Sequence, residues 1–247
     1  MDVILEIFDT YLFDRLYAAA LPASPAGVFY NALGEKSVNA SIAGLQDAAA
    51  LGAAKWQYEP ATEWIFLTPG DHAYMSQWSR DNAWRQTLSL YLITTLFGAM
   101  IYLVCASLSY LFVFDHATFQ HPKYLKNQIV LEMRQALFAM PIMAIFTVPF
   151  FALEVRGYSK MYDTFADAPF SAYNLLQIPI FLVFTDFFIY WIHRGLHHPR
   201  VYKHLHKPHH KWIMPTPFAS HAFHPVDGFA QSIPYHVFPF IFPLQKF

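Results

Sequence analysis

The chain has 247 residues, with 16 Lys and Arg against 17 Asp and Glu, so its formal net charge is −1. Apolar residues make up 55% of the chain and charged residues only 13%, about half the charged share of an ordinary soluble domain. This composition indicates a membrane protein, and without an excess of basic residues nothing favours nucleic-acid binding. The single cysteine, Cys105, excludes an intramolecular disulfide, a zinc site built from several thiolates and an iron–sulfur cluster.

The first 20 residues carry apolar side chains near helical spacing, at Ile4, Leu5, Phe8, Leu12 and Tyr17. Acidic residues interrupt this segment and it lacks a basic start, so it is not a signal peptide. A short amphipathic helix on the membrane surface and a helix packed against the rest of the protein explain the apolar positions equally well. Residues 18–80 are rich in Ala, Pro and Gly without a sustained period, which predicts loops and short helices.

Three charge-poor runs predict membrane helices at about 88–114, 136–153 and 172–192. The first run alone exceeds the roughly 20 residues that cross the hydrocarbon core. Buried helices of a soluble protein are the alternative, and three separate runs argue against it. We therefore predict an all-α fold in which an integral membrane helical bundle, residues 88–247, carries a cytoplasmic histidine-rich helical cap that binds metal. Residues 1–87 form a separate N-terminal region.

Basic residues in short loops predict the orientation of the bundle, because they concentrate on the cytoplasmic side. The segment 194–211 contains five Lys and Arg and no acidic residue, so we expect it in the cytoplasm. The loop 115–135 then lies on the same side, and 154–171 and 1–87 lie in the lumen. Asn39-Ala40-Ser41 matches the glycosylation acceptor pattern, which agrees with a lumenal N-terminal region.

Histidine is concentrated after the third run: ten of the 13 histidines lie in the 44 residues from His193 to His236. Three clusters contain the candidate metal ligands, which are His193, His197, His198, His206, His209, His210, His221 and His224. If the third run continues as a helix, His193 and His197 share one face at i and i+4, and His206 and His210 have the same spacing. Eight candidates are too many for one ion and suit two. A histidine-rich loop that binds metal weakly or senses pH is the alternative.

Imidazole ligands suit zinc, copper, iron and nickel alike, so ligand type does not identify the metal. The membrane setting favours a lipid substrate, and most lipid C–H bonds are unactivated. Attack on such bonds needs oxygen chemistry at a redox metal, which favours a di-iron site over zinc.

Two stretches resemble the sterol C5-desaturases of the fatty acid hydroxylase superfamily: TDFFIYWIHRGLHHPRVYKHLHKPHHKW (185–212) and PTPFASHAFHPVDGFAQSIPYHVFPFIFPLQK (215–246). The related C4-methyl sterol oxidases share the two histidine boxes but not the TPFASHAFHP run. The resemblance covers about 88–247 strongly, and the N-terminal part looks like that of fungal members.

The resemblance implies that the boxes 193–198 and 206–210 bind two non-haem iron ions through His193, His197, His198, His206, His209 and His210. His221 and His224 are further ligands or outer partners. Asp186, seven residues before His193 and so on its face of the helix, is expected to orient a ligand ring. Asp227-Gly228 is interpreted as an ordinary turn.

The activity implied is the O2-dependent introduction of the C5–C6 double bond into Δ7-sterols during ergosterol-type sterol biosynthesis, in the endoplasmic reticulum membrane. Electrons would come from NAD(P)H through cytochrome b5 and its reductase. Two alternatives stay open: a sterol or fatty acid hydroxylase of the same superfamily, and a non-catalytic membrane protein whose histidines bind metal.

The family also has a third H-x2-H-H box after a further membrane segment, and the sequence given stops at Phe247 before such a box. The final apolar run, 237–244, is eight residues long and is predicted to be too short for a span. We therefore expect these 247 residues alone to lack part of the iron ligand set and to have little activity.

Overall fold

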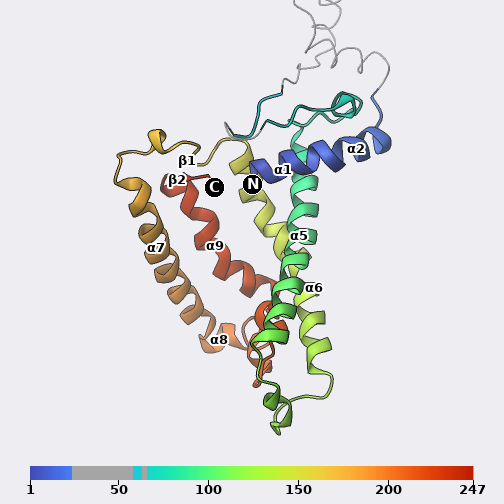
Figure 1. Cartoon of the computed structure of the whole chain (residues 1–247). Coiled ribbons are helices and arrows are strands. Elements are labelled where there is room, and N and C mark those ends of the chain that lie inside the picture. The colour runs from blue at the N-terminus through green and yellow to red at the C-terminus, as the bar shows by residue number, and fades with distance from the viewer. Residues whose placement is uncertain (24–57, 63–65, 247) are drawn as a thin grey trace, which may run out of the picture. The chain divides into compact units, whose positions relative to one another are not determined.

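Helices make up nearly all the regular structure in the computed structural model, which describes residues 1–23, 58–62 and 66–246 (Figure 1). The predicted all-α class is confirmed. The chain divides into two compact units, Met1–Ser89 and Leu90–Phe247, which are considered separately. The possible glycosylation site at Asn39 lies outside the described residues.

The first unit contains a continuous helical segment made of α1 (Asp2–Phe8), η1 (Asp9–Phe13) and α2 (Asp14–Ala20). A short helix, η2 (Asp71–Tyr74), precedes the first turns of α5 (Ala83–Phe112) in this unit. The predicted N-terminal helix is therefore present.

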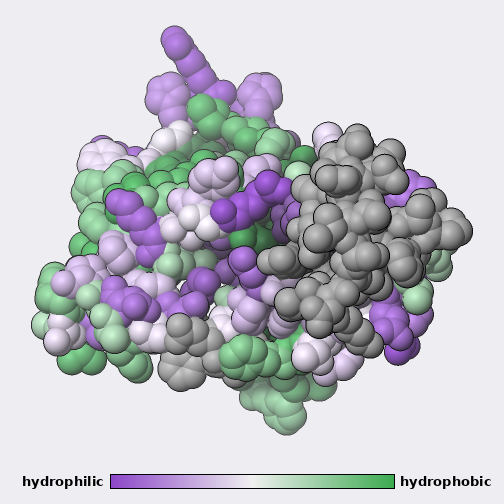
Figure 2. Space-filling view, turned by 90° about the horizontal axis from the view of Figure 1, so that it is seen from above, coloured by the Kyte–Doolittle hydropathy of each residue, from purple (hydrophilic) through white to green (hydrophobic). Residues whose placement is uncertain are grey.

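Three helices are long and apolar enough to cross a membrane: α5, α6 (Gln128–Val155) and α7 (Tyr173–Leu196). They correspond to the three predicted runs. Large apolar side chains point outward from them, with Leu175 79% and Val183 70% exposed, as expected where lipid replaces water. The face seen from above in Figure 2, by contrast, carries many hydrophilic residues. The chain is a multi-pass membrane protein.

Short elements connect and follow the long helices: η3 (His116–Gln120), β1 (Met161–Tyr162), η4 (Phe165–Asp167), α8 (Pro199–Tyr202), η5 (His209–Lys211), η6 (Pro217–His221), α9 (Pro225–Ile241) and β2 (Leu244–Gln245).

Helix α6 begins eight residues before the predicted run, because its first turns carry buried polar side chains that hold the segment after α8. Gln128 Nε2 donates to the carbonyl of Met214 at 2.7 Å. Gln135 Nε2 donates to the carbonyls of Pro208 and Ala222 at 3.2 and 2.7 Å. These hydrogen bonds from the start of α6 hold the histidine-rich segment in place.

Glu132, between these two glutamines, is fully buried and is expected to be needed for stability. It accepts hydrogen bonds from Gln128 Nε2 at 2.7 Å and from the amide and hydroxyl of Thr216. Glu132→Ala leaves these donors unsatisfied, which should destabilise the fold by about 2–4 kcal/mol. Thermal unfolding in detergent would show this as a lower melting temperature, whereas exposed Arg134→Ala should change it little. An unchanged melting temperature for Glu132→Ala would contradict the prediction.

Helix α9 returns through the bundle from the histidine-rich end to the turn between α6 and α7. It packs between α6 and α7 (Figure 1). Beyond its end, β2 pairs in parallel with β1, with Met161 opposite Leu244. The final apolar run, 237–244, covers the end of a longer helix: α9 has 17 residues and spans about 25 Å at 1.5 Å per residue. It is not among the three helices that are long and apolar enough to cross a membrane. Because the first turns of α9 contain polar residues, the hydropathy pattern did not predict the full length of this helix.

We expect α9 to cross the membrane, so that Lys246 and Lys207 lie on opposite sides. Because Cys105 is the only cysteine, Cys105→Ser provides a background for single cysteines. In sealed microsomes, an impermeant maleimide should label Lys207→Cys directly and Lys246→Cys only after the membrane is permeabilised. Exposed Tyr158→Cys, in the α6–α7 turn, should behave like Lys246→Cys. Labelling of Lys207→Cys and Lys246→Cys from the same side would contradict a crossing.

Candidate metal centre

Four imidazoles from the two predicted boxes converge where α7 ends. His193 and His197 come from the last turn of α7 and the residue that caps it, and His206 and His210 come from the turns after α8. One ring nitrogen of each lies within 4.8 Å of the others. The ring centroids of His193 and His197 are each 4.6 Å from that of His206. The two i, i+4 pairs therefore form one potential ligand group.

Asp227, in the first turn of α9, orients His206. Its Oδ2 is 2.8 Å from Nδ1 of His206, and both side chains are fully buried. Its other oxygen, Oδ1, accepts from Gln231 Nε2 at 2.7 Å, which directs Gln231 Oε1 to Nδ1 of His193 at 3.0 Å. Each of the two Nδ1 atoms therefore carries the proton, and Nε2 of His193 and of His206 offers a lone pair to the centre.

This donor set fits a metal ion. Nε2 of His193 lies 3.2 Å from Nε2 of His197, and Nε2 of His206 lies 3.0 Å from Nε2 of His210. Lone pairs facing each other at such distances repel unless a proton or a cation lies between them. A histidine whose second nitrogen donates to a carboxylate or carbonyl is the usual form of a metal-bound imidazole.

The surroundings favour the neutral form of the rings, which is the form that binds metal. Desolvation and the neighbouring imidazoles lower the pKa of His197 and of His210. Burial likewise lowers the pKa of His209, whose ring stacks on Phe223 with centroids 4.5 Å apart.

The other four predicted histidines lie outside this group of four. Nδ1 of His198 accepts from the amide of Arg200 at 3.4 Å and caps α8, and His224 caps α9 in the same way. His209 has its ring centroid 5.7 Å from that of His206. His221 packs edge-on against Tyr102. Their roles as ligands stay predictions.

Two expectations about carboxylates need correction. Asp186 is exposed on α7, and no hydrogen bond found among the described residues joins it to an imidazole. Asp227, expected in an ordinary turn, instead lies buried in α9 and contacts His206. A sequence signal existed: His224 followed by Pro225 is typical of a helix start, which places Asp227 in the first turn.

The chain is similar to a known family and to several curated proteins. The family model described as fatty acid hydroxylase matches residues 178–247. A Δ7-sterol 5(6)-desaturase of Leptosphaeria maculans is 61% identical over all of this chain and 69% of its own length. A probable Δ7-sterol 5(6)-desaturase of Neurospora crassa is 59% identical over all of this chain and 68% of its own length. A human lathosterol oxidase is 54% identical over 74% of this chain and 61% of its own length.

No solved structure matches the chain at a significant level. The family is shown by the curated relatives, because the fungal proteins match this chain from end to end at high identity. The chain belongs to the Δ7-sterol 5(6)-desaturase family.

Proposed function

We propose that this protein introduces the C5–C6 double bond into Δ7-sterols. The observation that carries the proposal is the group of four imidazoles at the end of membrane helix α7, in a chain 61% identical to a Δ7-sterol 5(6)-desaturase. A site at the end of a membrane helix is accessible to a lipid substrate that stays in the bilayer. The reaction removes one hydrogen from each of C5 and C6 and, with two further electrons and two protons, reduces O2 to two waters.

Iron held by His193, His197, His206 and His210 would supply the O2 activation that an unactivated C–H bond requires. The two remaining histidines of the boxes, His198 and His209, are the proposed source of ligands for a second iron. Residues around the site orient two of the four imidazoles. Asp227 and Gln231 hold the Nδ1 protons of His206 and His193, so that neither ring turns its protonated nitrogen toward the centre.

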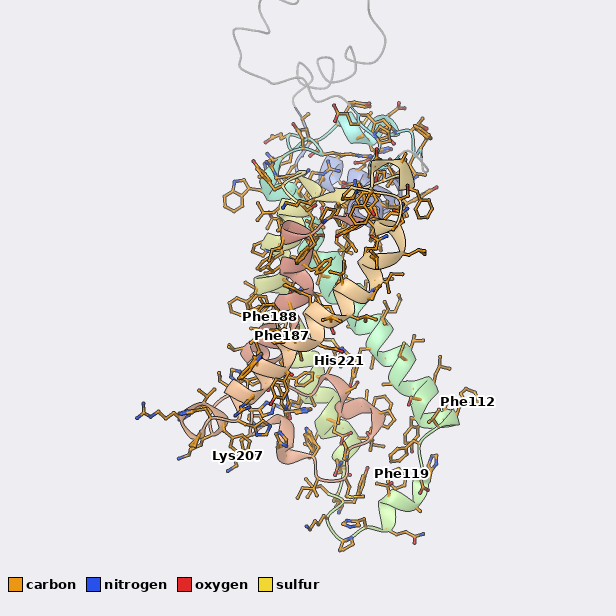
Figure 3. All side chains as sticks on the ribbon, turned by 90° about the vertical axis from the view of Figure 1, so that its left-hand side faces the viewer. Phe112, Phe119, Phe187, Phe188, Lys207 and His221 are labelled. Atoms are coloured by element: carbon orange, nitrogen blue, oxygen red, sulfur yellow. The ribbon has the colours of Figure 1, made fainter. Side chains whose placement is uncertain are left out.

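We propose that the protein lies in the endoplasmic reticulum membrane with the histidine boxes facing the cytoplasm. Five exposed basic residues surround the boxes and support this orientation: Arg194, Arg200, Lys203, Lys207 and Lys211. Lys207 lies near the point where α7 ends (Figure 3). Such a surface would also attract an acidic electron donor, which suits the proposed supply of electrons from NAD(P)H through cytochrome b5 and its reductase.

Product analysis would test the function. Membranes from a fungal strain without its own C5-desaturase, expressing the full-length protein, would receive a Δ7-sterol, NADH and air. We expect a sterol with the conjugated 5,7-diene, identified by mass spectrometry and ultraviolet absorption, and loss of the product when an iron chelator is added. An oxygenated sterol without the new double bond would favour the hydroxylase alternative, and unchanged substrate would favour a non-catalytic protein.

A further inference from the structure

The helical segment Asp2–Ala20 has an unusual distribution of polarity: three of its acidic residues are buried, while several of its large apolar residues are exposed. Glu6, Asp9 and Asp14 are buried, being 7%, 4% and 2% exposed. Burial raises the pKa of Asp9 even though an arginine contacts it. A helix on a water-facing surface has the opposite arrangement, with charges outward.

The buried acids fix this segment to the start of the first membrane span. Arg85, in the first turn of α5, is fully buried and pairs with Asp9 at 2.8 Å and with Asp14 at 2.6 Å. Arg80 makes a second ion pair with Asp14 at 2.6 Å. The guanidinium of Arg85 also lies over the ring of Tyr17, 4.7 Å from its centroid. Breaking buried pairs of this kind is costly, so the helix is held firmly beside this end of α5.

The opposite face of the segment is apolar and exposed. Its exposed residues are Ile7, Tyr11, Leu12, Arg15, Leu16, Ala19 and Ala20. Tyr11 is 67% and Leu16 51% exposed. Arg15 carries the one charge on this face, and its long stem allows the guanidinium to reach water from an apolar surface.

We propose that this face is an in-plane membrane anchor that lies in the bilayer surface, beside the point where α5 enters. The lipid-facing surface of α5 continues to its first turns, where Trp84 is 73% and Leu88 44% exposed. Trp84 and Tyr11 are residue types enriched at the headgroup level, and both belong to the same compact unit. Because Arg85 holds the helix at this end of the span, its apolar face lies at the depth where interfacial helices bury theirs, about 5–10 Å into the headgroup region.

The anchor can be tested with a fluorophore at a single cysteine. In the Cys105→Ser background, Leu16→Cys would carry an environment-sensitive label, and the protein would be placed in nanodiscs containing a lipid with a nitroxide near its headgroup. Exposed Asp71→Cys is the water-facing control in the same unit. The natural Cys105, exposed on α5, is the lipid-facing reference when labelled in the unmodified protein.

We expect the Leu16→Cys label to be quenched several-fold more by the lipid nitroxide than by a soluble nitroxide, and the Asp71→Cys label to show the reverse. Circular dichroism and the melting temperature would confirm that each variant is folded. Stronger quenching of the Leu16→Cys label by the soluble nitroxide would overturn the proposal, because the face would then contact water. Protection from both quenchers would also overturn it, since protein rather than lipid would cover the face.

Discussion

Replacement of His206 with alanine is expected to remove the metal from the protein and to abolish formation of the C5–C6 double bond. His206 is fully buried, and its two ring nitrogens contact Asp227 on one side and the imidazole group on the other. Loss of an outer partner of a ligand already lowers metal affinity about 10–100-fold, so loss of the ligand itself should lower it by more than about 100-fold. Iron per chain after purification and conversion of a Δ7-sterol measure the two effects.

His204→Ala is the matched control. His204 lies two residues earlier, is exposed, and does not belong to the group of four imidazoles. We expect this variant to keep its iron and its activity, and both variants to reach the membrane in folded form. Full iron content in His206→Ala would show that the group of four is not the metal centre.

The sequence predicted the spans well because charge-free runs leave few alternatives to a membrane. The ends of the helices were less predictable. Gln128 and Glu132 are polar, and hydropathy assigned them to a loop, yet both are buried in α6 against the segment that follows α8. The hydrogen-bond partner of such a buried polar residue lies some 80 positions away in the chain. The local sequence around it therefore looks the same as around a polar residue that faces water.

Helix α9 was missed for a related reason. Its first turns contain Asp227 and Gln231, which interrupt the apolar run and mark it as too short for a span. Both side chains point to imidazoles of the metal centre, so their polarity is satisfied inside the bundle. Polar residues that are buried and paired in a membrane protein indicate a functional site more often than a loop.

Spacing alone predicted that His193 would lie beside His197, and His206 beside His210. It did not predict that the two pairs meet, because that depends on the turn through α8 and on Asp227. The spacing also did not show which histidines are potential metal ligands and which cap a helix. A histidine directly before a proline offers its Nδ1 to the amides of the following turn, which is the environment of His198 and His224.

Asp227→Asn is expected to lower iron affinity about 10–100-fold while the fold is retained. The carboxylate now accepts two hydrogen bonds, one from His206 Nδ1 and one from Gln231 Nε2. Asparagine has one acceptor oxygen and one NH2 group, so it can satisfy only one of these donors. If its NH2 faces His206, the ring must move its proton to Nε2 and loses the lone pair that faces the centre. If its NH2 faces Gln231, two donors oppose each other and the link to His193 is broken.

Asp186→Asn provides the control for this change, because it makes the same substitution at an exposed carboxylate on α7. We expect Asp186→Asn to keep its iron, and Asp227→Asn to lose iron at chelator concentrations that the unmodified protein tolerates. The NMR chemical shifts of the His206 ring nitrogens would report the change of tautomer. If Asp227 had a purely structural role, these shifts would not change. The reverse result, with iron lost from Asp186→Asn and kept by Asp227→Asn, would restore Asp186 as the residue that orients a ligand. Because Asp227 contacts His206 directly and His193 through Gln231, its substitution should weaken both boxes together, which distinguishes it from the loss of any single ligand.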